Sequence, residues 1–191
     1  MECIGILEGH ADAVGAVAMS PRLASYASKA VIAFSGGSDK IIKRWELTPI
    51  FTAHLKSRSS SSSSSFTPTK SSSSSHSVRG HDKDINSVAL SPNDALLASC
   101  SQDRTIRLWD AATLSPLATL KGHKRGVWRV AFSSIDRVLA SCASDRSVKL
   151  WSLSDYSCIH TFEGHTASVL AVKFVNRGQQ LLSSASDGLI R

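Results

Sequence analysis

The chain has 191 residues, of which 42% are hydrophobic, and this length and composition are typical of a globular protein with a sizeable core. The chain has no apolar run near the roughly 20 residues of a membrane span, and its N-terminus lacks the basic segment of a secretory signal. Its four cysteines are too few and too widely spaced for a disulfide framework, which favours a reduced intracellular protein. The formal net charge of +7 permits contact with nucleic acid or with acidic proteins but selects neither.

The dominant feature of the sequence is an internal repeat. His81, His123 and His165 are spaced by 42 residues, and Asp103, Asp145 and Asp187 keep the same spacing. Short apolar segments rich in β-branched residues lie between these markers, four to a unit. Units of about 40–45 residues with Gly-His early and Trp-Asp late resemble the WD40 repeat. The predicted fold class is therefore all-β, a partial WD40 β-propeller of about four four-stranded blades that forms an open arc.

In chain order, the predicted elements follow this repeat with two interruptions. Residues 1–9 match the stretch before a later Gly-His pair, so we expect the outer strand of a missing preceding blade. Residues 10–56 are predicted to form a blade with a lengthened first loop at 21–31. Residues 80–121 and 122–163 are expected to be regular blades, and residues 164–191 a truncated one. An arc with two unpaired edges predicts a fragment that aggregates, or unfolds without sharp cooperativity, when it is expressed alone.

The second interruption, residues 57–79, is rich in serine and is predicted to be a disordered insertion. It is either a plain spacer or a segment that gains negative charge by phosphorylation. Two nearby segments, 51–56 and 76–80, are alternative outer strands for the first blade, and the sequence does not choose between them.

The repeated polar residues predict one hydrogen-bonded network in each blade. In WD40-like blades the Trp indole bonds to Ser, Ser to His, and His to Asp, which satisfies groups that would be costly to bury alone. The matching sets are His10, Ser35, Asp39 and Trp45; His81, Ser99, Asp103 and Trp109; His123, Ser141, Asp145 and Trp151; and His165, Ser183 and Asp187.

Read as chemistry, these Ser, His and Asp sets look like catalytic triads. An active site needs one nucleophile in one pocket, however, and here the same trio recurs in every blade. The repeated histidines belong to different blades and so do not form one metal site. We therefore expect no enzyme activity, no cofactor and no metal.

We call each His, Ser, Asp and Trp set a tetrad. The loops beside each Gly-His pair and beside each tetrad Asp lie on one rim of a propeller, which is the candidate partner-binding surface. This rim is modestly basic and mixed in sign, and it suits a protein partner, with RNA phosphate contacts as a further option. The candidate binding residues are Lys40, Lys83, Arg104, Lys124, Arg125 and Arg146.

Residues that the repeat does not require indicate a particular family. HDKDINSV (81–88), SPNDALLA (91–98) and VNRGQQLLSSASDGL (175–189) resemble the transducin beta-like 3 family. That family is the WD-repeat subunit associated with U3 small nucleolar RNA in the small-subunit processome.

The resemblance implies a scaffold for protein–protein assembly in pre-rRNA processing and small ribosomal subunit biogenesis, located in the nucleus and nucleolus. The implied partners are other WD40 propeller proteins of a processome subcomplex. Contact with U3 RNA or pre-rRNA is expected to be indirect, and no membrane partner is expected. The alternative is a WD40 adaptor of another class, either a ubiquitin-ligase substrate receptor or a G-protein β-like signalling module.

Overall fold

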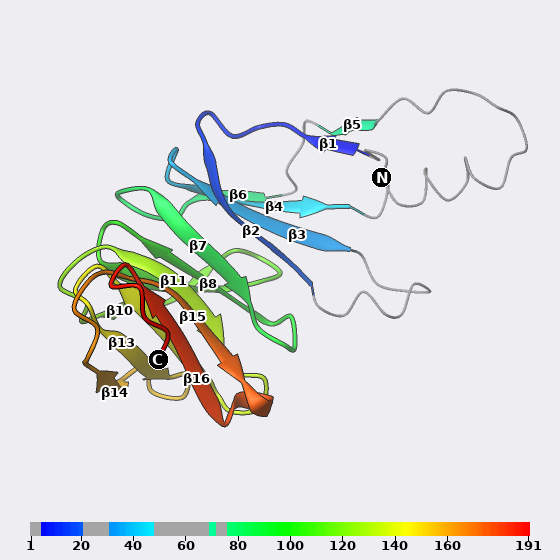
Figure 1. The fold of residues 1–191 in the computed structure, drawn as a ribbon. Helices are drawn as coiled ribbons and strands as arrows, with labels where there is room; N and C mark the ends of the chain where they lie inside the picture. The colour runs from blue at the N-terminus through cyan, green and yellow to red at the C-terminus, as the bar shows by residue number, and fades with distance from the viewer. Residues whose placement is uncertain (1–4, 21–30, 48–68, 72–75) are drawn as a thin grey trace, which may run out of the picture.

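The protein, described by a computed structural model over residues 5–20, 31–47, 69–71 and 76–191, is built from β-sheets that follow one another around an arc (Figure 1). Within these residues the helical structure is one short 3-10 helix, η1 (Asn176–Gly178), and no helix is long and apolar enough to cross a membrane. The sheets do not close into a ring: those nearest the two ends of the chain lie at opposite ends of the arc. The predicted all-β class and open arc are thus confirmed.

The two central blades are regular four-stranded antiparallel sheets. One has the order β10-β9-β8-β7, with β7 (Ile85–Leu90), β8 (Leu96–Ser101), β9 (Thr105–Asp110) and β10 (Pro116–Lys121). The next has the order β11-β12-β13-β14, with β11 (Val127–Phe132), β12 (Val138–Ala143), β13 (Val148–Ser152) and β14 (Cys158–Phe162). In each sheet, neighbouring strands in the chain are neighbours in space, so tight turns suffice to connect them.

The first blade takes its outer strand from the range that was predicted to be a disordered insertion. Its order is β2-β3-β4-β6, with β2 (Val14–Met19), β3 (Ile32–Gly37), β4 (Ile41–Glu46) and β6 (His76–Arg79). Of the two alternatives for this strand, the segment 76–80 supplies it, so the range 57–79 is not disordered throughout; the boundary predicted at residue 56 lies outside the described residues. Val78 of β6 packs against the core between blades, and β6 runs directly into Gly80 and His81, as the other outer strands run into their Gly-His pairs. The alternative strand at 51–56 and the long loop at 21–30 lie outside the described residues.

Two further strands complete the N-terminal end. β1 (Gly5–Leu7) pairs in parallel with β5 (Thr69–Ser71), and the pair forms a sheet of its own. The expected outer strand in residues 1–9 thus contributes β1, which joins none of the described blades. The fourth blade has β15 (Val169–Val175) and β16 (Gln180–Ala185), with one further bridge between Ser184 and Ile190.

Each innermost strand carries a β-bulge at the same place. The pairing register shifts at Val14/Ala16, Ile85/Ser87, Val127/Arg129 and Val169/Ala171. A bulge increases the local twist of a strand. Here the innermost strands of successive blades contact one another around the inside of the arc, and the Asn86 amide at the second bulge donates to the Val127 carbonyl of the next blade over 2.6 Å.

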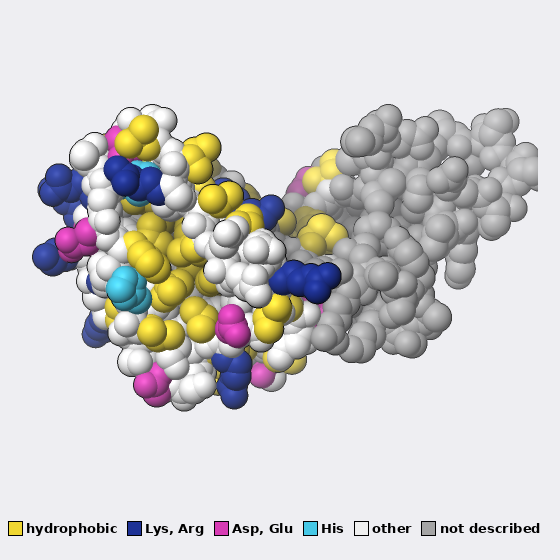
Figure 2. Space-filling view, turned by 60° about the horizontal axis from the view of Figure 1, so that its bottom comes forward, with side chains coloured by type: hydrophobic (Ala, Val, Ile, Leu, Met, Phe, Trp, Pro, Cys, Tyr) yellow, Lys and Arg dark blue, Asp and Glu magenta, His cyan; other side chains and the backbone are white. Residues whose placement is uncertain are grey.

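The hydrophobic core lies between the sheets rather than inside any one of them. One cluster joins the first and second blades through Phe34, Ile42 and Leu97, and a larger one joins the second and third blades through Leu108, Val130 and Leu139. Large apolar side chains stay exposed at the ends of the arc, for example Val17 at 65% and Ile190 at 75%. Figure 2 shows hydrophobic side chains gathered on one face of the described part, with charged side chains around them.

Gly37 offers a test of how tightly the first blade is packed. A Cβ at this buried position would lie 2.5 Å from the Ala13 carbonyl oxygen, which belongs to the backbone and cannot rotate away. We expect Gly37→Ala to lower the free energy of unfolding by about 1–3 kcal/mol, the usual cost of overpacking. Denaturant titration of the two proteins measures this loss, and an unchanged midpoint would contradict the packing described here.

Candidate functional site

The second blade shows how the repeated polar residues meet. The Trp109 indole Nε1 donates to the Ser99 hydroxyl over 2.9 Å, and the His81 Nε2 lies 2.8 Å from the same oxygen. The other ring nitrogen of His81 lies 2.9 Å from an Asp103 carboxylate oxygen. With Ser99 donating to His81 and His81 donating to Asp103, every group in this chain of bonds has a partner.

The same three distances recur in the neighbouring blades, between 2.6 and 2.9 Å. The sets are His10, Ser35, Asp39 and Trp45 in the first blade and His123, Ser141, Asp145 and Trp151 in the third. The structure therefore brings together all the residues that the spacing grouped. The serine hydroxyls are enclosed: Ser99 and Ser141 have no exposed surface.

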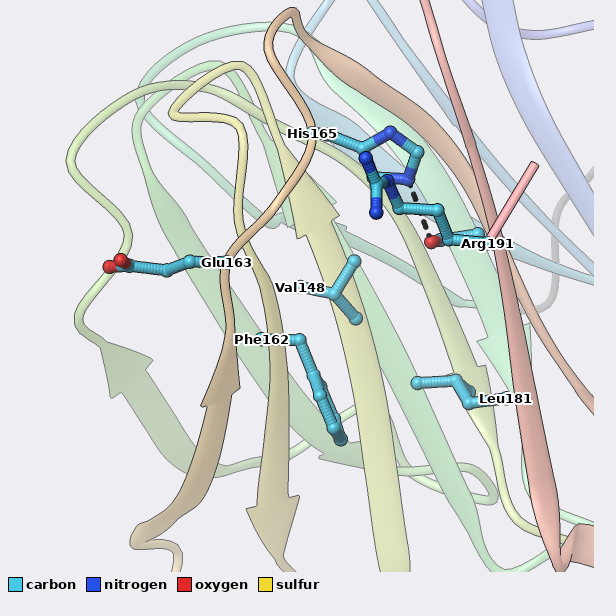
Figure 3. Close-up of a pocket in the computed structure, with 7 residues that line it drawn as sticks. Val148, Phe162, Glu163, His165, Leu181 and Arg191 are labelled. Atoms are coloured by element: carbon cyan, nitrogen blue, oxygen red, sulfur yellow. Dashed lines mark hydrogen bonds between the residues drawn. The ribbon is translucent and has the colours of Figure 1, made fainter. Parts of the chain in front are cut away.

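In the fourth blade, His165 lies 2.9 Å from both Ser183 and Asp187. Figure 3 shows His165 beside an apolar hollow of about 190 Å³ lined by Val148, Phe162 and Leu181. Gly164 borders the Arg191 side chain here, whereas the equivalent Gly122 borders the Trp151 ring.

The tetrad aspartate also forms hydrogen bonds with the loops of the rim. In the second blade, Asp103 accepts a hydrogen bond from the backbone N–H of Asp82 in the loop after Gly-His, and from the backbone N–H and hydroxyl of Thr105 in the β8–β9 turn. One carboxylate thus connects two rim loops to the buried network. The backbone N–H groups of Ala11, Lys124 and Thr166 make the corresponding bond in the other blades.

These hydrogen bonds lower the pKa of the tetrad carboxyl groups. For Asp103, burial by itself would raise the pKa, but the bonds from His81 and Thr105 outweigh it and hold the pKa well below its ordinary value. The same competition lowers the pKa of Asp39 and Asp145, and it lowers that of Asp187 to about 2. These carboxylates therefore stay ionised through the neutral and mildly acidic range.

The residue that follows each tetrad aspartate has a left-handed backbone. Lys40, Arg104 and Arg146 have φ of 66°, 73° and 69°, and Gly188 occupies the equivalent place with φ of 78°. This conformation is strained for residues with a Cβ and natural for glycine. Three of the six candidate rim residues therefore occupy one repeated, strained position at the tip of a turn.

The six candidate rim residues do not converge on one site. Lys124, Arg125 and Arg146 line a single groove of about 760 Å³ between the third and fourth blades. We call this the rim groove; its lining also includes the hydroxyl residues Ser144, Thr166 and Ser168, together with Glu163. Lys83 and Arg104 occupy the equivalent positions one blade earlier, and Lys40 lines a different hollow beside β6.

The hydroxyl residues of this groove, Ser144, Thr166 and Ser168, were not predicted from the sequence. The available signal was the 42-residue alignment, in which Ser144 replaces Gln102 and Ser168 replaces Gly126. A metal site finds no support in the described part of the chain, which contains no cluster of three or more His, Cys, Asp or Glu side chains suited to hold one.

Comparison with known proteins places these features in a family. The sequence matches the family described as "WD domain, G-beta repeat" over residues 1–46, 72–110, 114–152 and 156–191. The structure is similar to a solved structure described as "Structure of U3-55K", with a TM-score of 0.77 and 23% sequence identity, over 96% of this chain and 49% of that one. At this identity the likeness concerns the fold.

Two curated relatives show how far the sequence likeness extends. Transducin beta-like protein 3 of Mus musculus is 44% identical over 107 residues, which are 56% of this chain and 12% of the relative. Striatin-4 of Homo sapiens is 28% identical over 116 residues, 61% of this chain and 13% of the relative. The matched regions are thus a small part of either relative's length.

His81→Ala tests the contribution of one tetrad. It leaves the Ser99 hydroxyl and the Asp103 carboxylate without their shared partner, so we expect a loss of about 2–4 kcal/mol in the free energy of unfolding. His76→Ala, at an exposed histidine of β6, is the matched control and should change stability by less than about 0.5 kcal/mol. Equal effects of the two substitutions in denaturant titrations would contradict the network.

The lowered pKa of the tetrad carboxyl groups predicts the acid stability of the protein. A carboxyl group whose folded pKa lies below its unfolded value of about 3.9 stabilises the fold above that pH, and the contribution is lost as pH falls through the folded pKa. We therefore expect the free energy of unfolding to drop below about pH 4. Asp103→Asn should reduce stability at neutral pH and flatten this acid slope; an unaltered slope in denaturant titrations at several pH values would argue against the lowered pKa.

Proposed function

Because the chain belongs to the WD40 family of G-beta repeats, we propose that it is a non-catalytic scaffold that binds other proteins through the basic rim. The observation that carries this proposal is the arrangement around the tetrad aspartates. Each anchors a rim loop to the buried network, so exposed side chains such as Lys124 and Arg146 project from a rigid frame. A preorganised surface binds a partner at a lower entropic cost than a mobile one.

We assign the tetrads a structural role within this scaffold. The Ser99 hydroxyl is fully buried and already bonds to Trp109 and His81, so a substrate carbonyl has no access to it. The same holds for Ser141 in the third blade. Both observations favour a network that holds the blade over one that performs nucleophilic catalysis.

The finer proposal is that the scaffold works in the U3 snoRNP and small-subunit processome, in pre-rRNA processing, within the nucleolus. It is supported by the likeness to the transducin beta-like 3 family in residues that the repeat does not require, such as 81–88 and 175–189. The expected partners are other WD40 propeller proteins, with U3 RNA or pre-rRNA reached through them. The mixed signs of the rim, where Asp82 and Asp84 accompany Lys83, favour protein over direct RNA contact.

A WD40 adaptor of another class remains the second candidate function. The 28% identity with striatin-4 extends over a larger share of this chain than the transducin beta-like 3 match does. Repeat likeness alone therefore does not separate the two candidates, and a binding experiment is needed.

Affinity purification of the tagged 191-residue chain from nuclear extract provides that experiment. We expect it to recover other WD40 processome proteins together with U3 RNA, and ribonuclease treatment should leave the proteins bound. Replacing Lys83, Arg104 and Arg125 with Glu should reduce recovery at least about fivefold, because charge reversal opposes encounter and binding.

The control reverses Arg137 and Arg177, which are exposed in the turns at the opposite end of the blades. It should recover the partners as the unaltered chain does. Recovery of ubiquitin-ligase or G-protein subunits in place of processome proteins would overturn the finer proposal. Equal losses in both variants would overturn the role of the rim.

A further inference from the structure

The rim groove combines three cations that have no carboxylate partner. Lys124, Arg125 and Arg146 are exposed, and none of them forms an ion pair with another described residue. Asp145, the nearest tetrad carboxylate, is already bound to His123, Ser147 and the backbone N–H of Lys124. Asp145 and Glu163 also line the groove, so three cations face two carboxylates and the groove keeps a small positive charge.

The equivalent positions one blade earlier show that this arrangement is not required by the fold. There Gln102 stands where the rim groove has Ser144, and its side chain fills the space beside Gly126, whose missing Cβ would lie 2.1 Å from the Gln102 amide oxygen. The short Ser144 side chain leaves the corresponding space open. The charges change as well: Lys124 stands where the earlier blade has Asp82, Gly126 where it has Asp84, and Glu163 where it has Lys121.

The backbone at Arg146 is left-handed, as it is at Lys40 and Arg104 in the earlier blades. Its φ of 69° is strained for arginine, and Gly188 satisfies the same turn in the next blade without strain. A left-handed residue with a Cβ costs roughly 1–2 kcal/mol, and the turn itself gains nothing from a guanidinium group. Because the same strain recurs at Arg104, this position does not by itself single out the groove, and the side chains around Arg146 distinguish it.

The chemistry of the lining selects the ligand. Guanidinium groups bind phosphate oxygens in a bidentate manner, and the Ser144 and Thr166 hydroxyls add donors. The half-buried Trp128 has its indole N–H bonded to Ser144, and the aromatic ring in the groove lining, His165, is buried and bonded to Ser183 and Asp187, so it offers no face on which a base could stack. The Glu163 carboxylate at the edge would repel a continuous phosphate backbone and attract a cation next to a single phosphate.

We propose that the rim groove is a binding site for a phosphorylated serine or threonine, in a peptide segment that carries a basic residue near the phosphate. Arg125, Arg146 and Lys124 contact the phosphate, Ser144 and Thr166 donate to its oxygens, and Glu163 contacts the basic residue of the peptide. This assignment rests on the proposed role of the rim as a partner-binding surface, and it names the chemistry of one partner segment.

The test uses the purified 191-residue chain and a labelled pool of nine-residue peptides with a central phosphothreonine and a lysine two positions away. The pool without the phosphate and an oligouridylate of nine nucleotides are the comparison probes. Fluorescence polarisation at an ionic strength of about 0.15 M should show at least about tenfold tighter binding of the phosphorylated pool than of either.

The variants separate the groove from general positive charge. Arg146→Gln should weaken phosphopeptide binding about tenfold, and Ser144→Gln, which restores the side chain that fills the earlier groove, should weaken it comparably. Arg137→Gln removes a cation from an exposed turn at the opposite end of the blades and should change affinity less than about twofold. Circular dichroism establishes whether each variant is folded. If Ser144→Gln does not fold, the effect of Arg146→Gln on phosphopeptide binding tests the proposal alone.

Three outcomes would overturn the inference: equal binding of the phosphorylated and unphosphorylated pools, an equal effect of Arg137→Gln and Arg146→Gln, or tighter binding of the oligonucleotide. The assay contains no processome component, so its failure leaves the scaffold proposal standing if the affinity purification succeeds. The reverse result, phosphopeptide binding without processome partners, would overturn only the finer proposed function.

Discussion

The hydrogen bonds of the tetrad aspartate are the interaction on which the rest of each blade depends. In the second blade one carboxylate joins the buried imidazole of His81, the loop after Gly-His and the turn between β8 and β9. Removing any of these groups would leave a buried polar atom without a partner, which costs more than a single hydrogen bond contributes. The same contacts fix the height and direction of the rim loops, so stability and surface geometry have one origin.

Packing between blades extends this local order along the arc. Each of the two central sheets buries one face against the sheet before it and the other against the sheet after it, and these core clusters therefore contain residues from two blades. The β-bulges twist the innermost strands, and at one of them Asn86 bridges directly to Val127. The rigidity of a blade therefore depends on its packing against the neighbouring blades. The exposed apolar residues at the two ends of the arc, such as Val17 and Ile190, have no neighbouring sheet among the described residues.

Much of this structure follows from the sequence because the determinants are local and repeated. The 42-residue spacing predicts which His, Ser, Asp and Trp residues meet, since equal positions in equal blades have equal surroundings. The outer strand of the first blade could not be predicted in this way. The segments 51–56 and 76–80 have similar strand propensity, and the pairing of β6 with β4 depends on long-range register and on the path into Gly80. The rim groove was missed for a related reason, because the contact of Gln102 with Gly126 joins residues of different blades.

Comparison among blades separates the residues that maintain the fold from those free to acquire a function. His and Asp of the tetrad are the same in all four units, and a basic residue recurs on the third strand at Lys43, Arg107 and Lys149. In the structure Lys149 bonds to Thr161 of the neighbouring strand, whereas Arg107 pairs with Asp82 of the loop after Gly-His, so the recurring basic residues make different contacts within their blades. The loop after Gly-His behaves differently: its first residue is Ala11, Asp82, Lys124 and Thr166 in turn, although the backbone N–H at that position makes the same bond each time. The repeated bond uses only the backbone there, so the side chain differs between blades: Asp82 forms an ion pair with Arg107 over 3.6 Å, whereas Lys124 forms none with the described residues. Such differences indicate where a partner would distinguish one groove from the next.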